Sequence, residues 1–196
     1  MVTVESIKTT DDGRVILRLH QDGESTVYNV PASLYGSMSF VRGGRLTDDE
    51  LSMIKRADEE YRAMKKALSL LGYSDKNRRS LYLRLLREGY SREVVEKVVE
   101  RCLSLGYIRE TDQLERLILR EANTNLRGPR YIREKLAAKG YNRSDIDSVM
   151  DSLVESGEID FQGNLQRLYE KHGADTDGQR RTLAYKHGYG SGFFDD

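Results

Sequence analysis

The chain has 196 residues, of which 33% are charged and 8% aromatic, and its formal net charge is zero. This length suits one large or two small domains, and neutrality argues against a polycation drawn to nucleic acid by charge alone. No apolar run approaches the roughly 18 residues that a membrane-spanning helix needs. The single cysteine, Cys102, rules out an internal disulfide framework, so we expect a soluble, cytoplasmic protein.

The charge is unevenly distributed. Residues 61–112 hold 12 basic and 7 acidic side chains, whereas residues 1–60 hold 7 basic and 11 acidic ones. The rest of the chain is close to balance. The positive excess is therefore predicted on the first of the helical repeats described below.

The first 30 residues predict a three-stranded antiparallel meander. Apolar, alternating runs begin at Val2, Val15 and Val27, and Asp-Gly pairs at 12–13 and 22–23 separate them. An Asp-Gly pair between such runs is a strong hairpin signal. Because so small a sheet is not stable alone, we expect it to pack on the helix that follows.

A connector and a long helix are predicted next. Residues 33–46 form the connector, with three apolar side chains tucked under the sheet: Leu34, Tyr35 and Phe40. The run Thr47-Asp48-Asp49-Glu50 fits a capping box and predicts the start of the helix, which Gly72 ends. Asp58 interrupts its apolar stripe and predicts loose packing of its first half.

The remaining sequence repeats with a period of about 51 residues. Gly89 and Gly140 are 51 residues apart, as are Gly106 and Gly157, and Gly188 lies 48 residues beyond Gly140. A unit of this length exceeds the usual two-helix repeats. It therefore predicts three short helices per unit.

The opening helix of the second repeat is the best defined. Gly128 suits the N-cap, and Pro129 suits the first helical position, where no amide hydrogen is needed. Ile132 and Leu136 form a narrow apolar stripe, and Gly140 ends the helix. In the other helices the predicted N-caps are Asn77, Ser91 and Ser144, and a third helix of repeat one is predicted over 111–122.

The third repeat is short. We expect its tail to be poorly ordered, or Phe193 and Phe194 to dock back on repeat two. The chain is predicted to divide into five parts. A β-rich head (1–46) and a connecting helix (47–73) come first, and two three-helix repeats (74–124 and 125–174) and a truncated third repeat or tail (175–196) follow.

These motifs resemble the RecX family of regulators of the RecA recombinase. The resemblance rests on Gly128-Pro129-x-x-Ile132-x-x-x-Leu136-x-x-Lys139-Gly140, supported by Leu81-x-x-x-Leu85-x-x-x-Gly89, Gly106-Tyr107-Ile108 and Leu168-Tyr169-Glu170-Lys171-His172-Gly173. It covers about residues 47–190. The chain departs from the family at Asn77 and Ser80, at Arg109-Glu110 in place of an acidic pair, and in the missing closing helices of the third repeat.

The resemblance implies a mostly α fold of tandem three-helix repeats in an elongated curved array. It also implies a non-enzymatic regulator, without cofactor or metal, that lies in the groove of the RecA filament on single-stranded DNA. Such a protein would inhibit ATP hydrolysis, strand exchange and filament extension in recombination, DNA repair and the SOS response. We expect a monomer with no membrane partner.

The basic side chains of the opening helices are the candidate contacts for such a filament or for DNA phosphates. Their recurrence in consecutive repeats would make one extended surface. They could equally be solvated helix faces, since acidic residues are interspersed among them. The candidates are Arg78, Arg79, Arg84, Arg87, Arg127, Arg130, Arg133 and Lys139.

Other residue patterns carry weaker signals. Four tyrosines could stack on bases, although core packing is the favoured interpretation: Tyr82, Tyr90, Tyr131 and Tyr141. Cys102 lies within an apolar stripe and is predicted to be buried. The three histidines are scattered along the chain and make no plausible zinc set with one cysteine.

Two alternative functions stay open at this point. The chain could bind single-stranded nucleic acid by itself through the basic first repeat, with a steep salt dependence. It could also be a helical scaffold protein with no link to recombination.

Overall fold

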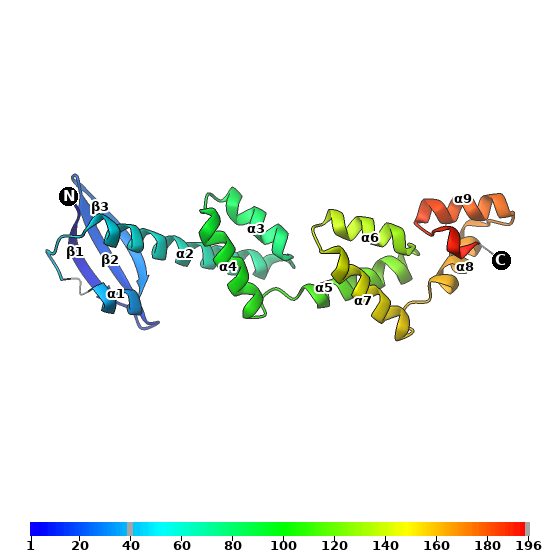
Figure 1. Cartoon of the computed structure of the whole chain (residues 1–196), viewed down its shortest axis with the longest axis horizontal. Helices are drawn as coiled ribbons and strands as arrows, with labels where there is room; N and C mark the ends of the chain where they lie inside the picture. The colour runs from blue at the N-terminus through cyan, green and yellow to red at the C-terminus, as the bar shows by residue number, and fades with distance from the viewer. Residues whose placement is uncertain (39–40, 195–196) are drawn as a thin grey trace. The chain divides into compact units, whose positions relative to one another are not determined.

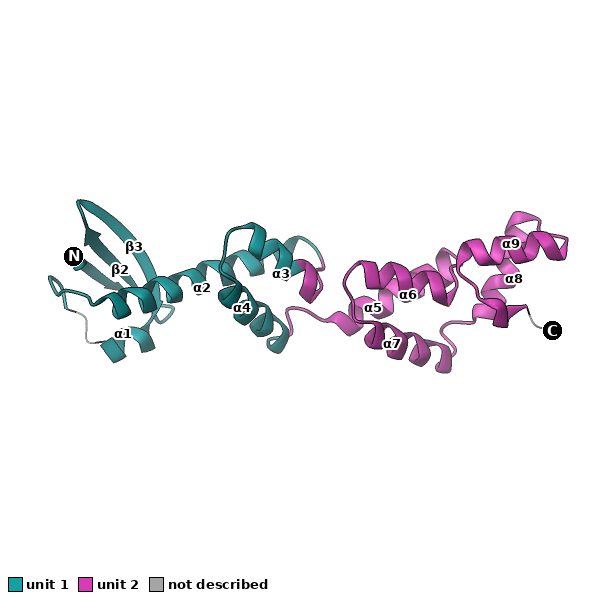
Figure 2. Cartoon of the chain, turned by 45° about the horizontal axis from the view of Figure 1, so that its top comes forward, with its two compact units in different colours: residues 1–74, 81–105 teal, residues 75–80, 106–196 magenta. Residues whose placement is uncertain are grey.

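A computed structural model of the chain describes residues 1–38 and 41–194. These residues fall into two compact units (Figure 2). Unit 1 comprises residues 1–74 and 81–105, and unit 2 comprises residues 75–80 and 106–196. The described part is mostly helical, with a three-stranded sheet near the N-terminus (Figure 1), as predicted. Within it, no helix has both the length and the apolar character needed to span a membrane.

The predicted meander is confirmed. β1 (Thr3–Thr9), β2 (Arg14–Gln21) and β3 (Glu24–Pro31) pair antiparallel in the order β1-β2-β3. The two turns contain Gly13 and Gly23 at φ of 74° and 89°. Glycine reaches such values without steric cost, which is why Asp-Gly pairs predict tight hairpins.

The sheet packs on the long helix α2 (Asp48–Tyr73), whose Ile54 is fully buried against Leu17 and its neighbours. Asp58 is also buried, at 5% exposure, and accepts a 2.8 Å hydrogen bond from the Asn29 amide while pairing with Arg62 at 2.8 Å. The prediction that Asp58 loosens the helix was wrong. A buried carboxylate with these partners ties the helix to the sheet instead.

The connector and the ends of α2 partly follow the prediction. The capping box at Thr47 is confirmed, but α2 continues past Gly72 to Tyr73. The connector contains a helix that was not predicted, α1 (Ala32–Met38). Leu34 and Tyr35 pack against the sheet core as expected, while Phe40 lies outside the described residues.

The predicted helical repeats are confirmed along the rest of the chain. The span predicted as the first repeat holds α3 (Arg78–Arg87), α4 (Arg92–Ser104) and α5 (Glu110–Leu119), which passes into a π-helical turn at Arg120–Thr124. Within their own units, however, α4 packs on α2 and α5 packs on α7. The second has α6 (Pro129–Ala138), α7 (Arg143–Glu155) and α8 (Phe161–His172). α9 (Asp177–His187) opens the third.

The first helix of each repeat ends in the same way. Gly89, Gly140 and Gly188 have φ of 91°, 96° and 88°. In each case the glycine amide donates to the carbonyl three residues back, and the next amide donates to the carbonyl five residues back. This pair of bonds defines the Schellman motif, so the 51-residue spacing reports equivalent local structure.

The tail docks on unit 2, which is the second of the two predicted outcomes. Tyr189 is fully buried, and Phe193 and Phe194 pack against the same core. The ring of Phe161 meets those of Tyr189 and Phe193 edge-on at 6.5 Å.

One predicted helix start was wrong. The N-cap of α7 is Asn142 and not the predicted Ser144, whose amide donates to the Asn142 side chain. The five-part division of the chain and the curved array stay predictions.

Candidate functional site

The candidate basic residues lie on α3 and on or beside α6. Arg127 is half-buried, and the other seven are exposed. The apolar sides of both helices explain this placement. Leu81 and Leu85 of α3, like Ile132 and Leu136 of α6, are buried, which turns the intervening arginines outward.

Half of the candidates already have partners within the chain. Arg84 pairs with Glu88 at 2.8 Å, Arg133 with Asp147 at 2.5 Å and Arg130 with Glu134 at 4.0 Å. The guanidinium of Arg127 lies 4.4 Å above the ring of Tyr131. Exposed pairs such as these contribute at most about 1 kcal/mol, so an acidic partner can displace them.

The side chains of the remaining four candidates form no ion pair in the described parts of the chain. They are Arg78, Arg79, Arg87 and Lys139. Lys139 and the N-terminal end of α3 meet in unit 2, where the Asn77 side chain donates a 2.9 Å hydrogen bond to the Lys139 carbonyl. The stem of Arg79 covers Gly140, since a Cβ there would lie 2.6 Å from Arg79 Cδ. The structure therefore brings these two cationic residues to one junction.

A second junction of the same kind joins α9 to α6. The amides of Gly128 and Arg130 donate to the carbonyls of His187 and Gly188 at 2.9 and 3.1 Å. The two glycines are needed because the backbones touch: a Cβ on Gly128 would lie 2.6 Å from the Gly188 backbone. In both junctions a helix N-terminus sits on the C-terminal turn of another first helix.

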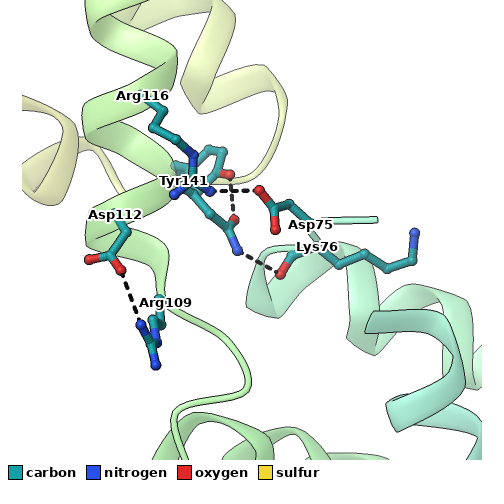
Figure 3. A network of polar contacts seen from close by, with 7 residues as sticks. Asp75, Lys76, Arg109, Asp112, Arg116 and Tyr141 are labelled. Atoms are coloured by element: carbon teal, nitrogen blue, oxygen red, sulfur yellow. Dashed lines mark hydrogen bonds and ion pairs between the residues drawn. The ribbon is translucent and has the colours of Figure 1, made fainter. Parts of the chain in front are cut away.

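A cleft of about 520 Å³ opens beside the first junction, within unit 2. Its polar groups form a network (Figure 3). Tyr141 donates to Gln113 Oε1 at 2.8 Å, Gln113 donates to the Lys76 carbonyl at 3.3 Å, and Arg116 pairs with Asp75 at 2.6 Å. The lining residues are Asp75, Asn77, Ser80, Gln113, Arg116, Leu117, Arg120, Lys139 and Tyr141.

Sequence reasoning missed two of the cations in this cleft, Arg116 and Arg120. They lie four residues apart on α5 and its π-helical extension, a spacing that places both side chains on one face. That spacing was a usable signal. With Lys139 they outnumber the single lining carboxylate, Asp75, so the cleft favours anionic groups.

Of the four tyrosines, Tyr141 packs against a hydrophobic core as predicted, and the other three are half-buried. Burial raises the pKa of Tyr141, and the nearby carboxylates of Glu110 and Asp75 add to this effect, so its phenol stays protonated and donates. The ring of Tyr131 is covered by Arg127. Tyr82 accepts a 3.1 Å hydrogen bond from Arg92.

The nucleophilic and metal-binding side chains are not assembled into a catalytic site in the described residues. Cys102 is fully buried, and burial raises the pKa of its thiol, which disfavours the reactive thiolate. The rings of His172 and His187, which the sequence had shown only as scattered, lie 5.9 Å apart. No third potential ligand joins them to make a metal site among the residues described.

Comparisons with known proteins find one matching family model. Residues 63–102 match the family model described as RecX, first three-helix domain. A sequence comparison with curated proteins finds no match.

Two solved structures share the fold. One, described as regulatory protein RecX, has a TM-score of 0.71 at 20% identity over 99% of this chain and 97% of its own. The other, RecX from Lactobacillus salivarius, has a TM-score of 0.59 at 15% identity over 70% of this chain and 92% of its own. The matched domain and the shared fold both support the recognition made from the sequence: residues 63–102 match a RecX three-helix domain, and the chain has the fold of solved RecX structures.

Proposed function

We propose that the chain regulates the RecA recombinase by binding the RecA filament on single-stranded DNA, in the filament groove. Binding there inhibits ATP hydrolysis, strand exchange and filament extension during recombination and repair. The chain acts as a cytoplasmic monomer and catalyses no reaction of its own.

The observation that carries this proposal is the match of residues 63–102 to a RecX domain, together with a fold shared along 99% of the chain with a RecX regulatory protein. The exposed arginines of α3 and α6 add a physical reason. They recur on equivalent helices, and four of the eight candidates lack an ion-pair partner in the described chain. A filament of bound DNA and acidic side chains supplies such partners.

The test is to add the purified chain to RecA filaments on single-stranded DNA and to follow ATP hydrolysis. We expect inhibition by the natural chain and at least about tenfold weaker inhibition by Arg130→Glu/Arg133→Glu, because both contacts become repulsive. The melting temperature should change little, since the lost surface ion pairs are weak. Arg143→Glu/Arg181→Glu makes the same charge change on α7 and α9 and serves as the control.

The outcomes separate the alternative functions. Unchanged inhibition by the α6 variant, with inhibition by the natural chain intact, would remove Arg130 and Arg133 from the contact. No inhibition, combined with salt-sensitive binding to single-stranded DNA alone, would favour a nucleic-acid-binding protein. Absence of both activities would leave the scaffold interpretation.

A further inference from the structure

In two of the three repeats, the turn that ends the first helix is occupied by the N-terminal turn of a neighbouring first helix. Arg79 at the start of α3 lies over Gly140, and Tyr131 at the start of α6 lies over Gly188, where a Cβ would come within 2.5 Å of the Tyr131 amide nitrogen. The carbonyls of Lys139 and His187, each one residue before the glycine, accept hydrogen bonds at 2.9 Å.

The equivalent turn of the first repeat, Glu88–Gly89–Tyr90, is unoccupied. Its backbone is the same, since Gly89 has φ of 91° and forms the same pair of Schellman bonds. Yet Gly89 is exposed, and a Cβ there would meet nothing within 4 Å. No described residue donates a hydrogen bond to the Glu88 carbonyl.

We infer that the turn at Glu88–Tyr90 is a docking site for the N-terminal turn of a helix from the partner protein. This inference deepens the proposed function, on which it rests. The two occupied turns show what such a site accepts: a helix N-terminus that donates to the free carbonyl and lays a long stem or an aromatic ring over the glycine. The positive end of the incoming helix dipole would face the negative end of α3.

The charges in the first turns of α3 and α6, which fill the two occupied sites, indicate what kind of helix the partner should present. Neither α3 nor α6 has an acidic residue in its first turn, and an acid there would face the carbonyls at the end of the other helix. Among the first helices of the repeats, the one whose N-terminus is not seated on another first helix in the described chain is α9, which begins with Asp177. Its N-cap amide, that of Thr176, is already bonded to the Gln179 side chain. A second copy of this chain is therefore a poor occupant, and a helix without acids in its first turn is a good one.

The variant Gly89→Asn tests the site. Asparagine tolerates positive φ better than other side chains and would fill the space above the turn. The control is Gly106→Asn, because Gly106 also has positive φ, at 72°, with open space around it and ends the second helix of the repeat. We expect similar melting temperatures for the two variants, about tenfold weaker binding of RecA filaments by Gly89→Asn, and unchanged binding by Gly106→Asn.

A measurement on the natural chain covers the case in which Gly89→Asn does not fold. Hydroxyl-radical labelling should be lower at Tyr90 when the filament is bound and unchanged at Tyr107, which also follows a positive-φ glycine and is 50% exposed. Full filament binding by a folded Gly89→Asn, or unprotected Tyr90, would overturn the docking site but leave the proposed function standing. Self-association that Gly89→Asn abolishes would overturn it in favour of a second copy. Failure of the natural chain to bind filaments would instead refute the proposed function.

Discussion

Single residues set the geometry of the repeat junctions. Gly188 meets two requirements at once: a φ of 88° and backbone contact with the start of α6. Gly157 meets only the first, because its φ is 78° and a Cβ there would meet nothing within 4 Å. A side chain at Gly157 therefore strains only the backbone of the turn, whereas a side chain at Gly188 also disturbs the contact with α6. Substitutions at the two positions measure these two free-energy costs separately.

We predict that Gly157→Ala lowers the free energy of unfolding by about 1–2 kcal/mol, the steric cost of a left-handed L residue. Gly188→Ala should lose roughly twice as much, since the methyl group also displaces Tyr131 from the turn. Urea titrations of both variants measure the difference. Equal losses would show that the junction opens without cost.

A buried carboxylate, Glu121, joins the π-helical turn to α6. Glu121 is 2% exposed and accepts a 2.8 Å hydrogen bond from Lys135. Burial alone would raise the pKa of Glu121, but hydrogen bonds from Lys135 and Asn125 and the charges of Lys135 and Arg120 outweigh it, so the pKa is lowered. The carboxylate is thus held ionised inside the protein.

Removal of Lys135 should show how much its charge stabilises the buried carboxylate of Glu121. We predict that Lys135→Met costs about 3 kcal/mol, because among the described residues it leaves the buried carboxylate with only Arg120, at 3.7 Å, as a charged partner. The double variant Lys135→Met/Glu121→Gln should regain part of the loss, since an amide carries no charge. Thermal melts of the natural chain and the two variants at pH 7 measure these losses. A double variant no more stable than Lys135→Met would contradict the prediction.

The sequence predicts those residues whose role is local. The Gly128-Pro129 start, the glycine turns and the buried Ile132 follow from rules that act over a few neighbours. The pairings of Glu121 and Arg116 could not be found in this way, because their partners Lys135 and Asp75 are 14 and 41 residues away. Asp58 was misjudged for the same reason, since its partner is an edge amide of the sheet.

At the scale of elements, the least anticipated feature is the junction of α9 with α6. Burial lowers the pKa of His187, the charge of Arg127 lowers it further, and His172 and Lys186 add smaller effects, while a hydrogen bond to the Leu126 backbone acts in the opposite direction. Its Nδ1 is buried without a hydrogen-bond partner among the described residues. A proton on this ring would therefore be poorly accommodated.

This junction should respond to pH. The unfolded chain, with an ordinary histidine pKa of about 6.5, binds a proton more readily than folded His187 does. The stability that His187 contributes is thus complete above that pKa and is lost as the pH falls below it. We predict that His187→Gln loses less stability than the natural chain between pH 7.5 and 5.5 in urea titrations. His20→Gln, on an exposed part of β2, is the control and should follow the natural chain.

The short tail shows where element prediction fails. The third repeat is too short to form its remaining helices, which predicts a poorly ordered tail. Yet Tyr189 is fully buried and donates toward the Leu126 carbonyl at 3.4 Å. The composition of a segment indicates whether it would be ordered in isolation. Whether one of its aromatic rings is buried depends on the hydrophobic core of the rest of the chain. The alternative prediction, that the tail docks through Phe193 and Phe194, was correct because apolar rings need such a core.

At the scale of the whole molecule, hydrophobic clusters among the described residues stabilise different parts of the chain, and two of them can be compared. One contains the sheet residues Val15 and Leu17 with Ile54 of α2. The other contains Ile132 and Leu136 with residues from α5 to Tyr189. The two clusters share no residue, so each is expected to respond to its own substitutions, as in chains whose repeats are stabilised by nearest-neighbour contacts.

Hydrogen exchange on two cavity variants tests this independence. Leu17→Ala and Leu136→Ala remove equivalent side chains that are 0% and 1% exposed, and each should cost about 3 kcal/mol locally. We expect Leu17→Ala to speed amide exchange in β2 and β3 while leaving α7 and α8 protected, and Leu136→Ala to do the reverse. The reason is that local opening needs only the contacts of one cluster to be lost. Equal acceleration throughout the chain in both variants would instead show that the two clusters unfold as one cooperative body, and the junctions in unit 2 would then owe their stability to the sheet as well.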